Sequence, residues 1–421
     1  MGLGNIWRFP YVTGKYGGST FLFIYILVVI IMGAPLVLAE FALGRSAKSD
    51  VVDTFKRLGG RRWEIVGWMG FFSVFVILSY YAVIAGCTLA YMFKSLTGLM
   101  EEAAAGRAAE YFSAFVSDPV QVIGYQLAVM GVCVTVVYRG IDRGIEKCCK
   151  ILMPVLFIFL FLLTARSLTL PGASEGLSFY LMPDISKLSY ECVLTAIGQA
   201  FFSLSLAMGI DITYGSYLDE NEYIPNMTRT IVCLDTLVAF MAGLIIFPAV
   251  FAFGLEAGAG PGLTFITLPN VFAKMPAGVF FSFVFFALFF IAAITTTFAS
   301  LEVIVSFGID RLKWSRPKSS LIMGSVVALF GIPSALSVGG HFPQLYGKDF
   351  LDAMDFITNN AVVPICAILT AIYVGWFWKD SKVEITCRGK YNFRSYSVWI
   401  WICRIVAPVF IGIMFIKGLV W

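Results

Sequence analysis

Eleven apolar runs, most of them about 20 residues or longer, constrain the fold of this chain more than any other feature. A helix of about 20 apolar residues crosses roughly 30 Å of hydrocarbon. Hydrophobic residues fill 59% of the 421 positions and charged residues only 13%, too few charges to cover a soluble protein of this size. The short alternating segments of a membrane β-barrel are absent. We therefore predict an all-α polytopic membrane protein whose segments span residues 5–18, 19–44, 66–98, 119–138, 148–166, 188–217, 229–254, 278–309, 319–337, 351–378 and 396–420.

The distribution of lysine and arginine predicts the orientation of these segments. When the loop at 45–62 is placed in the cytoplasm, most of the basic loop residues fall on that side, as the positive-inside rule requires. The loops on the other side carry six: Lys15, Arg107, Arg166, Lys187, Lys274 and Lys348. Basic runs beside membrane spans usually anchor the chain at the lipid surface. We expect the lipid bilayer, and no nucleic acid, as their partner.

Two segments depart from uniform apolarity, and both contain glycine and polar residues at membrane depth. The first is GLGN at residues 2–5, and the second is the run from Gly198 to Gly209 in the sixth segment. Irregular backbone inside a bilayer is tolerated only where it lines a cavity or is buried in protein. Broken helices in first and sixth position predict a 5+5 inverted-repeat transporter with its binding site at the breaks. The alternative is that these small residues only allow helices to pack closely.

This reading gives one transmembrane domain over residues 1–421. Repeat one covers about 1–166, repeat two about 188–378, and an eleventh helix at about 396–420 stands outside the repeats.

Several motifs, in order along the chain, carry a family resemblance. They are GLGNIWRFPY, GAPLVLAEFALGR, SYYAVIAGCTLAY, GQAFFSLSLAMG, ITYGSY, AAITTTFASLE and LDAMDF. Together they resemble the neurotransmitter:sodium symporters, in particular the bacterial amino-acid branch. The resemblance implies a transporter rather than an enzyme, located in the bacterial inner membrane, that couples sodium to amino-acid uptake by alternating access. A monomer or weak homo-oligomer is expected.

The resemblance also implies where the substrate binds. The backbone amides of Leu3 and Gly4 and the hydroxyl of Tyr81 are expected at the substrate carboxylate, with Ser203 nearby. The side-chain pocket is expected to contain Ile77, Phe202, Ser205, Met208, Thr296 and Ser300. Gly2 and Thr295 stand where monoamine transporters have aspartates, which favours an amino acid with its carboxylate intact. Met208 is flexible and polarisable, so we expect a hydrophobic or aromatic substrate.

Two sodium sites are implied, since Na⁺ prefers several oxygen ligands. The first is expected to use Asn5, Ser203, Asp235 and the substrate carboxylate itself. The second is expected to use Ala292, Thr295, Thr296 and the carbonyl of Met1. Without the family, the threonine hydroxyls are equally well explained by bonds to their own helix. A carboxylate at Asp235 supplies the negative charge that chloride supplies in the animal members, so chloride is not expected to be required.

For the gates, the resemblance implies an outer pair, Arg8 and Asp355, and an inner latch that includes Tyr217 and Asp310. Met1 stands where the family is already at mid-membrane. A half-helix, the latch arginine and part of both ion sites are therefore expected upstream, and the chain as written is expected to fold without transporting. Two other functions remain open: proton-coupled amino-acid transport on the same fold, and a non-transporting sensor or inactive paralogue.

Overall fold

The computed structural model describes residues 2–254, 262–345 and 347–420, and its secondary structure elements there are all helices. One isolated bridge joins Leu345 and Lys348. In these described ranges, nine helical stretches are long and apolar enough to span a membrane. This confirms the predicted all-α polytopic class.

The nine stretches match predicted segments two to five and seven to eleven. Five consist of single long helices or nearly so: α5 (Glu64–Lys94), α8 (Pro119–Tyr138), α13 (Ile224–Ala252), α15 (Gly278–Asp310) and α16 (Arg316–Val338). Each of the other four contains at least one π-helical turn. One of them is built mainly on a single helix, α9 (Lys147–Leu168). The remaining three each join two helices: α2 (Ser19–Val28) with α3 (Ala34–Ala47), α17 (Phe350–Ile357) with α18 (Val363–Ile372), and α20 (Tyr396–Trp401) with α21 (Ala407–Val420).

Segment six is broken, as predicted, whereas segment one is helical without interruption from Leu3 to Lys15, so no break at 2–5 is seen among the described residues. The first consists of the π-helical turn η1 (Gly4–Arg8) and α1 (Phe9–Lys15), and the sixth of α11 (Tyr190–Ser203) and α12 (Ile210–Ser216). Between α11 and α12 the backbone leaves the helical region, with φ of +54° at Ser205 and +61° at Ala207. Positive φ is uncommon for residues other than glycine. Glu40 of α3 holds this linker, because its Oε1 accepts the Ala207 amide proton at 2.7 Å.

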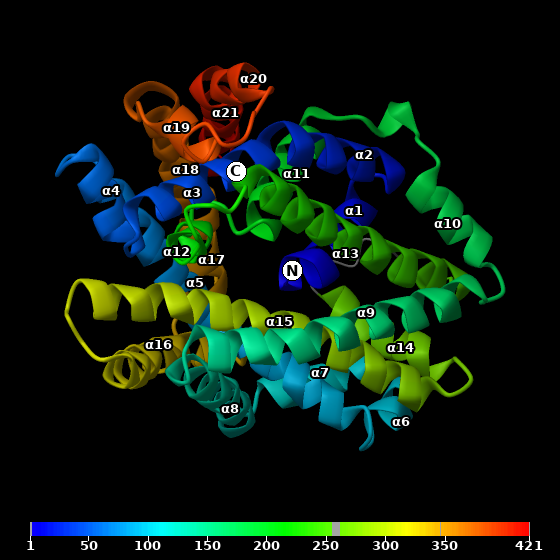
Figure 1. The fold of residues 1–421 in the computed structure, drawn as a ribbon. Coiled ribbons are helices and arrows are strands. Elements are labelled where there is room, and N and C mark those ends of the chain that lie inside the picture. Colours follow the sequence, from blue (N-terminus) through cyan, green and yellow to red (C-terminus); the bar gives the residue numbers. More distant parts are fainter. Residues whose placement is uncertain (1, 255–261, 346, 421) are drawn as a thin grey trace.

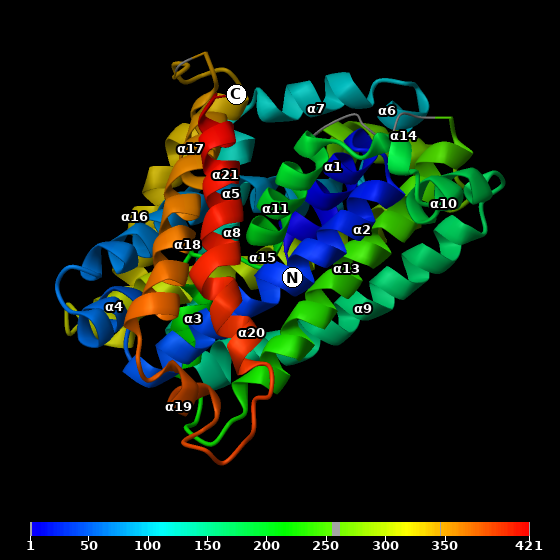
Figure 2. The ribbon, with the colours of Figure 1, turned by 90° about the horizontal axis from the view of Figure 1, so that it is seen from above.

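Short helices cover the two ends of the bundle (Figures 1 and 2). In Figure 2, α6 (Leu99–Ala104), α7 (Ala108–Val116) and α14 (Leu268–Ala273) lie near the top, with α10 (Ala173–Leu181) to their right. At the opposite end, α19 (Ser381–Ile385) lies near the bottom, and α4 (Val51–Gly59) lies at the left edge. The long helices between them run across the bundle.

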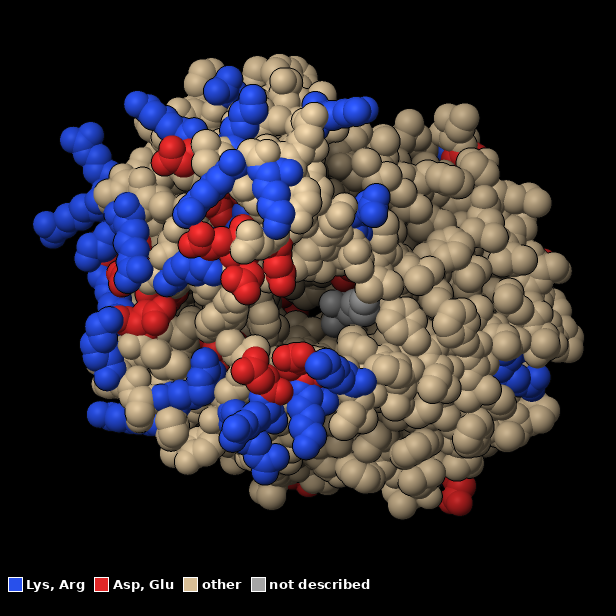
Figure 3. Space-filling model, in the orientation of Figure 1, with Lys and Arg blue, Asp and Glu red and all other residues tan. Residues whose placement is uncertain are grey.

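Charged side chains gather on one part of the surface, as the positive-inside pattern predicts. Figure 3 shows Lys and Arg concentrated at the left, where Figure 1 has α4 and the turn between α15 and α16, while the right part is largely uncharged. Asp50 caps α4 by accepting the amide protons of Val52 and Asp53. Burial raises the pKa of its carboxyl to about 6. The loop side of the bundle therefore has ordered polar structure of its own.

Close helix packing fixes the inner half of segment six on α3. A Cβ at Gly44 would meet the backbone oxygen of Ile212, and a Cβ at Gly215 would meet the backbone oxygen of Phe41 at 2.5 Å. Glycine at both positions lets the two backbones approach closely. The helices α3 and α12 therefore pack closely against each other, and the α11–α12 linker is attached to α3 by the hydrogen bond from the Ala207 amide to Glu40.

Candidate substrate and ion site

A small cavity of about 30 Å³ lies between the first residues of segment one and the break in segment six. All ten residues that the sequence predicts at the substrate line it, together with Gly2 and Ile210. The ten are Leu3, Gly4, Ile77, Tyr81, Phe202, Ser203, Ser205, Met208, Thr296 and Ser300. They come from η1, α5, α11, the α11–α12 linker and α15. Residues from four helical segments and one linker therefore line the same cavity.

One end of this central cavity is polar. The Leu3 amide donates a proton to the Tyr81 hydroxyl at 3.0 Å. A Cβ at Gly2 would lie 2.5 Å from the Thr296 hydroxyl, and a Cβ at Gly4 would lie 3.0 Å from the Phe202 ring. The two glycines therefore let the backbone approach these neighbours, and no acidic side chain fits at position 2 without displacing Thr296. An amide and a phenol at hydrogen-bond distance suit a carboxylate.

The predicted first ion cluster is a buried network that joins three helices. Asn5 donates its amide protons to the Ser203 hydroxyl at 2.9 Å and to the Asp235 carbonyl at 2.8 Å. Ser203 in turn donates to the Asp235 carboxylate at 2.5 Å. Asn5, Ser203 and Asp235 are 0%, 6% and 3% exposed. The Asn5 carbonyl oxygen, the group able to bind a cation, accepts the Gly2 amide proton at 3.0 Å.

Two residues that sequence reasoning missed complete this network. Tyr25 of α2 donates its hydroxyl proton to Ser203 at 3.1 Å. Gln199 of α11 donates to the Gly4 carbonyl at 2.8 Å. Both side chains are buried. A buried glutamine beside a broken helix could have been noticed in the sequence, because polar groups inside a membrane need partners.

The predicted second ion cluster lies within one turn of α15. Thr295 donates to the carbonyls of Ile291 and Ala292 at 2.9 and 3.2 Å, and Thr296 donates to the Ala292 carbonyl at 3.1 Å. Three oxygens from Ala292, Thr295 and Thr296 are thus close together. The predicted fourth ligand, Met1, lies outside the described residues.

The donor set of both clusters suits a hard monovalent cation. No group of three His, Cys, Asp or Glu side chains able to hold a metal occurs in the described parts of the chain. Hydroxyl, amide and carbonyl oxygens with one carboxylate are ligands for a hard ion rather than for zinc or iron.

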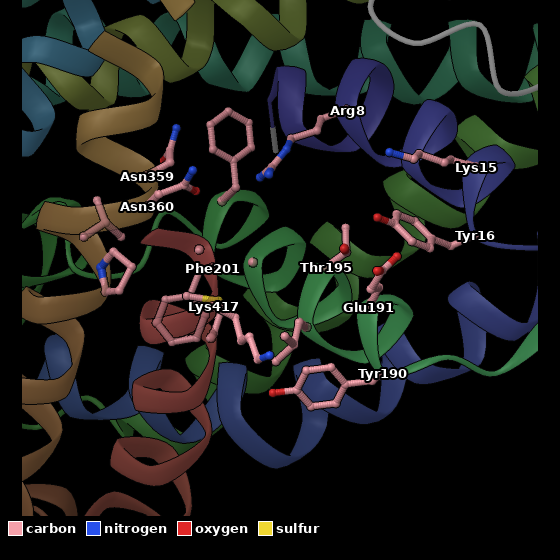
Figure 4. Close-up of a pocket in the computed structure, with 17 residues that line it drawn as sticks. Arg8, Lys15, Tyr16, Tyr190, Glu191, Thr195, Phe201, Asn359, Asn360 and Lys417 are labelled. Carbon is pink, nitrogen blue, oxygen red and sulfur yellow. The ribbon is translucent and has the colours of Figure 1, made fainter. Parts of the chain in front are cut away.

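A vestibule of about 580 Å³ lies outside the central cavity, between helices one, six, ten and eleven (Figure 4). Phe202 lines both spaces, so its ring separates them. The Arg8 guanidinium lies over this ring, 5.0 Å from its centroid. Figure 4 shows Arg8 and Lys417 entering the vestibule from opposite sides. Rotation of one aromatic side chain would join the vestibule to the central cavity.

The two predicted outer-gate residues have separate contacts. The Asp355 carboxylate accepts protons from Tyr80 at 2.8 Å and from Asn359 at 2.7 Å. Arg8 and Asp355 form no ion pair within the parts of the chain that the structure describes. Tyr80 and Asn359 were not predicted. Tyr80 directly precedes Tyr81, which was predicted, so the sequence motif had already marked this turn of α5.

On the opposite side, a second cavity of about 300 Å³ reaches the same cluster from α9, α12 and α13. Ser203, Ser205 and Thr296 line this inner cavity as well as the central one. Asp235 and Thr295 line it too. The candidate ion ligands therefore lie between two spaces, one on each side of the break in segment six.

The two residues predicted for the inner latch, Tyr217 and Asp310, have separate contacts, and Tyr217 bonds a residue that the sequence prediction missed. Glu302 of α15 accepts the Tyr217 hydroxyl proton at 2.7 Å and binds Arg316 through two bonds of 2.8 and 2.9 Å. Predicted Asp310 instead accepts the Asp50 amide proton at 2.8 Å. A fully buried acid in an apolar helix is a functional hypothesis by default, and that signal was present at Glu302.

Comparisons with known proteins identify the family and the fold. Residues 1–107 and 110–421 match the model of the sodium:neurotransmitter symporter family. An uncharacterized sodium-dependent transporter of Bacillus subtilis, YhdH, is 37% identical over 99% of this chain and 93% of its own length. A similar transporter of Haemophilus influenzae is 34% identical over 100% of this chain and 94% of its own. The crystal structure of MhsT in complex with L-phenylalanine superposes with a TM-score of 0.91, at 40% identity, over 99% of this chain and 96% of MhsT.

Proposed function

The chain belongs to the sodium:neurotransmitter symporter family, and from this premise we propose that it couples the entry of Na⁺ to the uptake of a hydrophobic or aromatic amino acid. Sodium-dependent transport is the activity named in its curated relatives. The proposal goes further than the relatives' names on three points: the class of substrate, the use of two sodium ions, and independence from chloride.

The observation that carries the proposal is the position of Ser203. Its side chain lines the central cavity and also bonds both Asn5 and Asp235. A substrate carboxylate at Leu3 and Gly4 would then lie next to a cation at Asn5 and Asp235. Direct contact between them couples the two bindings, and each ligand raises the affinity of the other by the same factor.

The two larger cavities support alternating access to this central site. The outer vestibule is separated from it by Phe202, and the inner cavity shares Ser203 and Thr296 with it. Transport requires that the outer and inner sides open in turn around a fixed site. The Glu302–Arg316–Tyr217 network holds the inner ends of α15, α16 and segment six together, and it must break for inward release.

Two observations support an amino acid that keeps its carboxylate. The space at Gly2 is filled by Thr296, so an acidic partner for a bare amine has no place there. The backbone amide of Leu3 donates to the Tyr81 hydroxyl instead, and we infer that a substrate carboxylate would take the place of that hydroxyl as the acceptor of this amide. MhsT has been solved with L-phenylalanine, which supports a hydrophobic or aromatic side chain here, as do Ile77 and Met208 in the cavity wall.

Uptake into proteoliposomes, by protein that also carries the half-helix expected upstream of Met1, tests the proposal against its alternatives. We expect labelled phenylalanine to accumulate when an inward Na⁺ gradient is imposed, and not when only a pH gradient is imposed. Accumulation under the pH gradient alone would favour proton coupling. Binding with no accumulation under either gradient would favour a sensor or an inactive paralogue.

Competition by an amine tests the carboxylate part separately. Tryptamine, which lacks the carboxylate of tryptophan, should compete poorly with labelled substrate for sodium-dependent binding. Equal competition by the two compounds would contradict binding at the Leu3 and Gly4 amides.

A further inference from the structure

Two hydroxyls in the wall of the central cavity, those of Ser205 and Ser300, have no hydrogen-bond partner among the described residues. Ser300 of α15 is 5% exposed, lines the cavity, and makes no hydrogen bond within the described residues. The other hydroxyls of α15 are all engaged: Thr295, Thr296, Thr297 and Ser306 donate to carbonyls of their own helix, and Ser282 pairs with Ser95. Ser300 therefore departs from the usual behaviour of serine in an apolar helix.

The Ser300 hydroxyl opens into the cavity, so a molecule bound there can supply the hydrogen bond that the protein does not. Ser205, which lines the same cavity, is only half-buried and also faces the inner cavity, where water reaches. Ser300 lines the central cavity alone. A bound substrate is thus the natural partner for the Ser300 hydroxyl.

The position of Ser300 says which part of the substrate it meets. Thr296 lies against Gly2 at the polar end of the cavity. Ser300 follows four residues later, about 6 Å further along α15. A carboxylate bound at Leu3 and Tyr81 would direct the substrate side chain towards that position. Ile77, Met208 and Ile210 form the apolar wall of the same cavity.

We propose that Ser300 is a specificity-determining residue that hydrogen-bonds an O–H or N–H group at the far edge of an aromatic substrate side chain. The inference rests on the proposed function and narrows its substrate class. Tyrosine and tryptophan are then bound in preference to phenylalanine. The ring of each would contact the same apolar wall once the cavity, about 30 Å³ in this structure, has widened around it, but only the first two amino acids satisfy the Ser300 hydroxyl. A site built around a hydrogen bond discriminates against the analogue that lacks the group.

The test is sodium-dependent binding of tyrosine and phenylalanine to the purified chain, measured by equilibrium dialysis. We expect wild-type protein to bind tyrosine about 3- to 10-fold more tightly than phenylalanine, the range of one neutral hydrogen bond. Ser300→Ala should reduce this ratio to about 1, because the bond that distinguishes tyrosine from phenylalanine is lost. Ser306→Ala is the matched control, because its hydroxyl on the same helix is bonded to Val303.

A second comparison uses wild-type protein alone, so it does not depend on how the variants fold. Tryptophan should bind more tightly than its 1-methyl derivative, in which the indole N–H is replaced. Equal or weaker binding of tyrosine than phenylalanine in wild type, or a ratio that survives Ser300→Ala, would overturn the inference while leaving sodium-coupled transport intact. If neither amino acid binds in the presence of sodium, the proposed function fails as well.

Discussion

The two candidate ion clusters are built in different ways. Asn5, Ser203 and Asp235 come from three separate helices, and their bonds join residues 198, 230 and 32 positions apart in the sequence. Ala292, Thr295 and Thr296 lie within one turn of α15, and their bonds span three or four positions. The first cluster exists only when the tertiary fold brings its members together, whereas the second is largely preset by a single helix.

This difference assigns distinct parts to the clusters under the proposed function. Asn5 lies near the start of segment one and Ser203 at the break in segment six, so movement of either segment changes the first cluster directly. The α15 turn keeps its geometry through such a movement, because its bonds are internal. Loss of a residue from the first cluster should therefore cost more than loss of one from the second.

The largest expected effect follows from Asp235→Ala. The carboxylate is 3% exposed and bonded to Ser203. Asp235→Ala removes a candidate Na⁺ ligand together with the negative charge that balances the ion, and we expect a loss of about 100-fold, equivalent to about 2.7 kcal/mol. Apparent Na⁺ affinity, measured as the sodium dependence of phenylalanine binding, should fall by that factor. Asp219→Asn, on the exposed turn after α12, should leave it unchanged, and a loss below about 5-fold in the first variant would contradict the account.

A smaller effect is expected in the local cluster. Thr295→Val removes one candidate ligand but leaves α15 intact, so Na⁺ affinity should fall by about 10-fold, the value of about 1.4 kcal/mol. Thr297→Val is the matched control, because its buried hydroxyl bonds only the Ile294 carbonyl and lines none of the cavities described above. Equal losses in the two variants would mean that the threonine hydroxyls act on the helix and not on an ion.

Tyr25→Phe tests whether Tyr25 contributes to the first cluster. The change removes the bond to Ser203 and keeps the ring against Phe9, at a centroid distance of 4.9 Å. A single neutral hydrogen bond is worth about 1 kcal/mol, so Na⁺ affinity should fall by about 5-fold. The same sodium titration measures it. No change would place Tyr25 outside the cluster.

The smallest expected effect lies outside the membrane, at Asp50. Burial, and then the nearby Asp53 and Asp310 carboxylates, raise the pKa of this side chain to about 6. A raised pKa in the folded state means that the contribution to stability is fully present below about pH 4, the unfolded pKa. It is then lost as the pH rises through about 6. The melting temperature in detergent should therefore fall slightly from pH 5 to pH 7.5, and the fall should be smaller in Asp50→Asn. An identical fall in both proteins would contradict this assignment.

Much of the fold could be predicted from the sequence because a bilayer leaves few alternatives. Long apolar runs must be helices, and glycine and polar residues at 198–209 mark the break in segment six, whereas the break predicted at 2–5 is not seen among the described residues. The family resemblance also implied that residues of three separate motifs meet, and Leu3, Tyr81 and Ser203 line one cavity.

Partners that depend on tertiary contacts were not predictable in the same way. Tyr25 reaches Ser203 across 178 positions, and Glu302 meets Tyr217 across 85. Neither pairing leaves a trace in local spacing. Glu302 could have been noticed as an acid in an apolar helix, but its partners could not. Likewise, the sequence does not show which hydroxyls of α15 bond to carbonyls of their own helix, so it could not show that Ser300 has no such bond.

The most direct test of the central claim is uptake into proteoliposomes, by protein that also carries the half-helix expected upstream of Met1, with sodium and chloride varied independently. The account predicts that an inward Na⁺ gradient drives accumulation of labelled amino acid equally well in chloride and in gluconate, because the Asp235 carboxylate already supplies the negative charge beside the first ion cluster. Replacing Na⁺ by choline should abolish accumulation in both media. Accumulation that persists in choline, or that disappears in gluconate with Na⁺ present, would contradict the account.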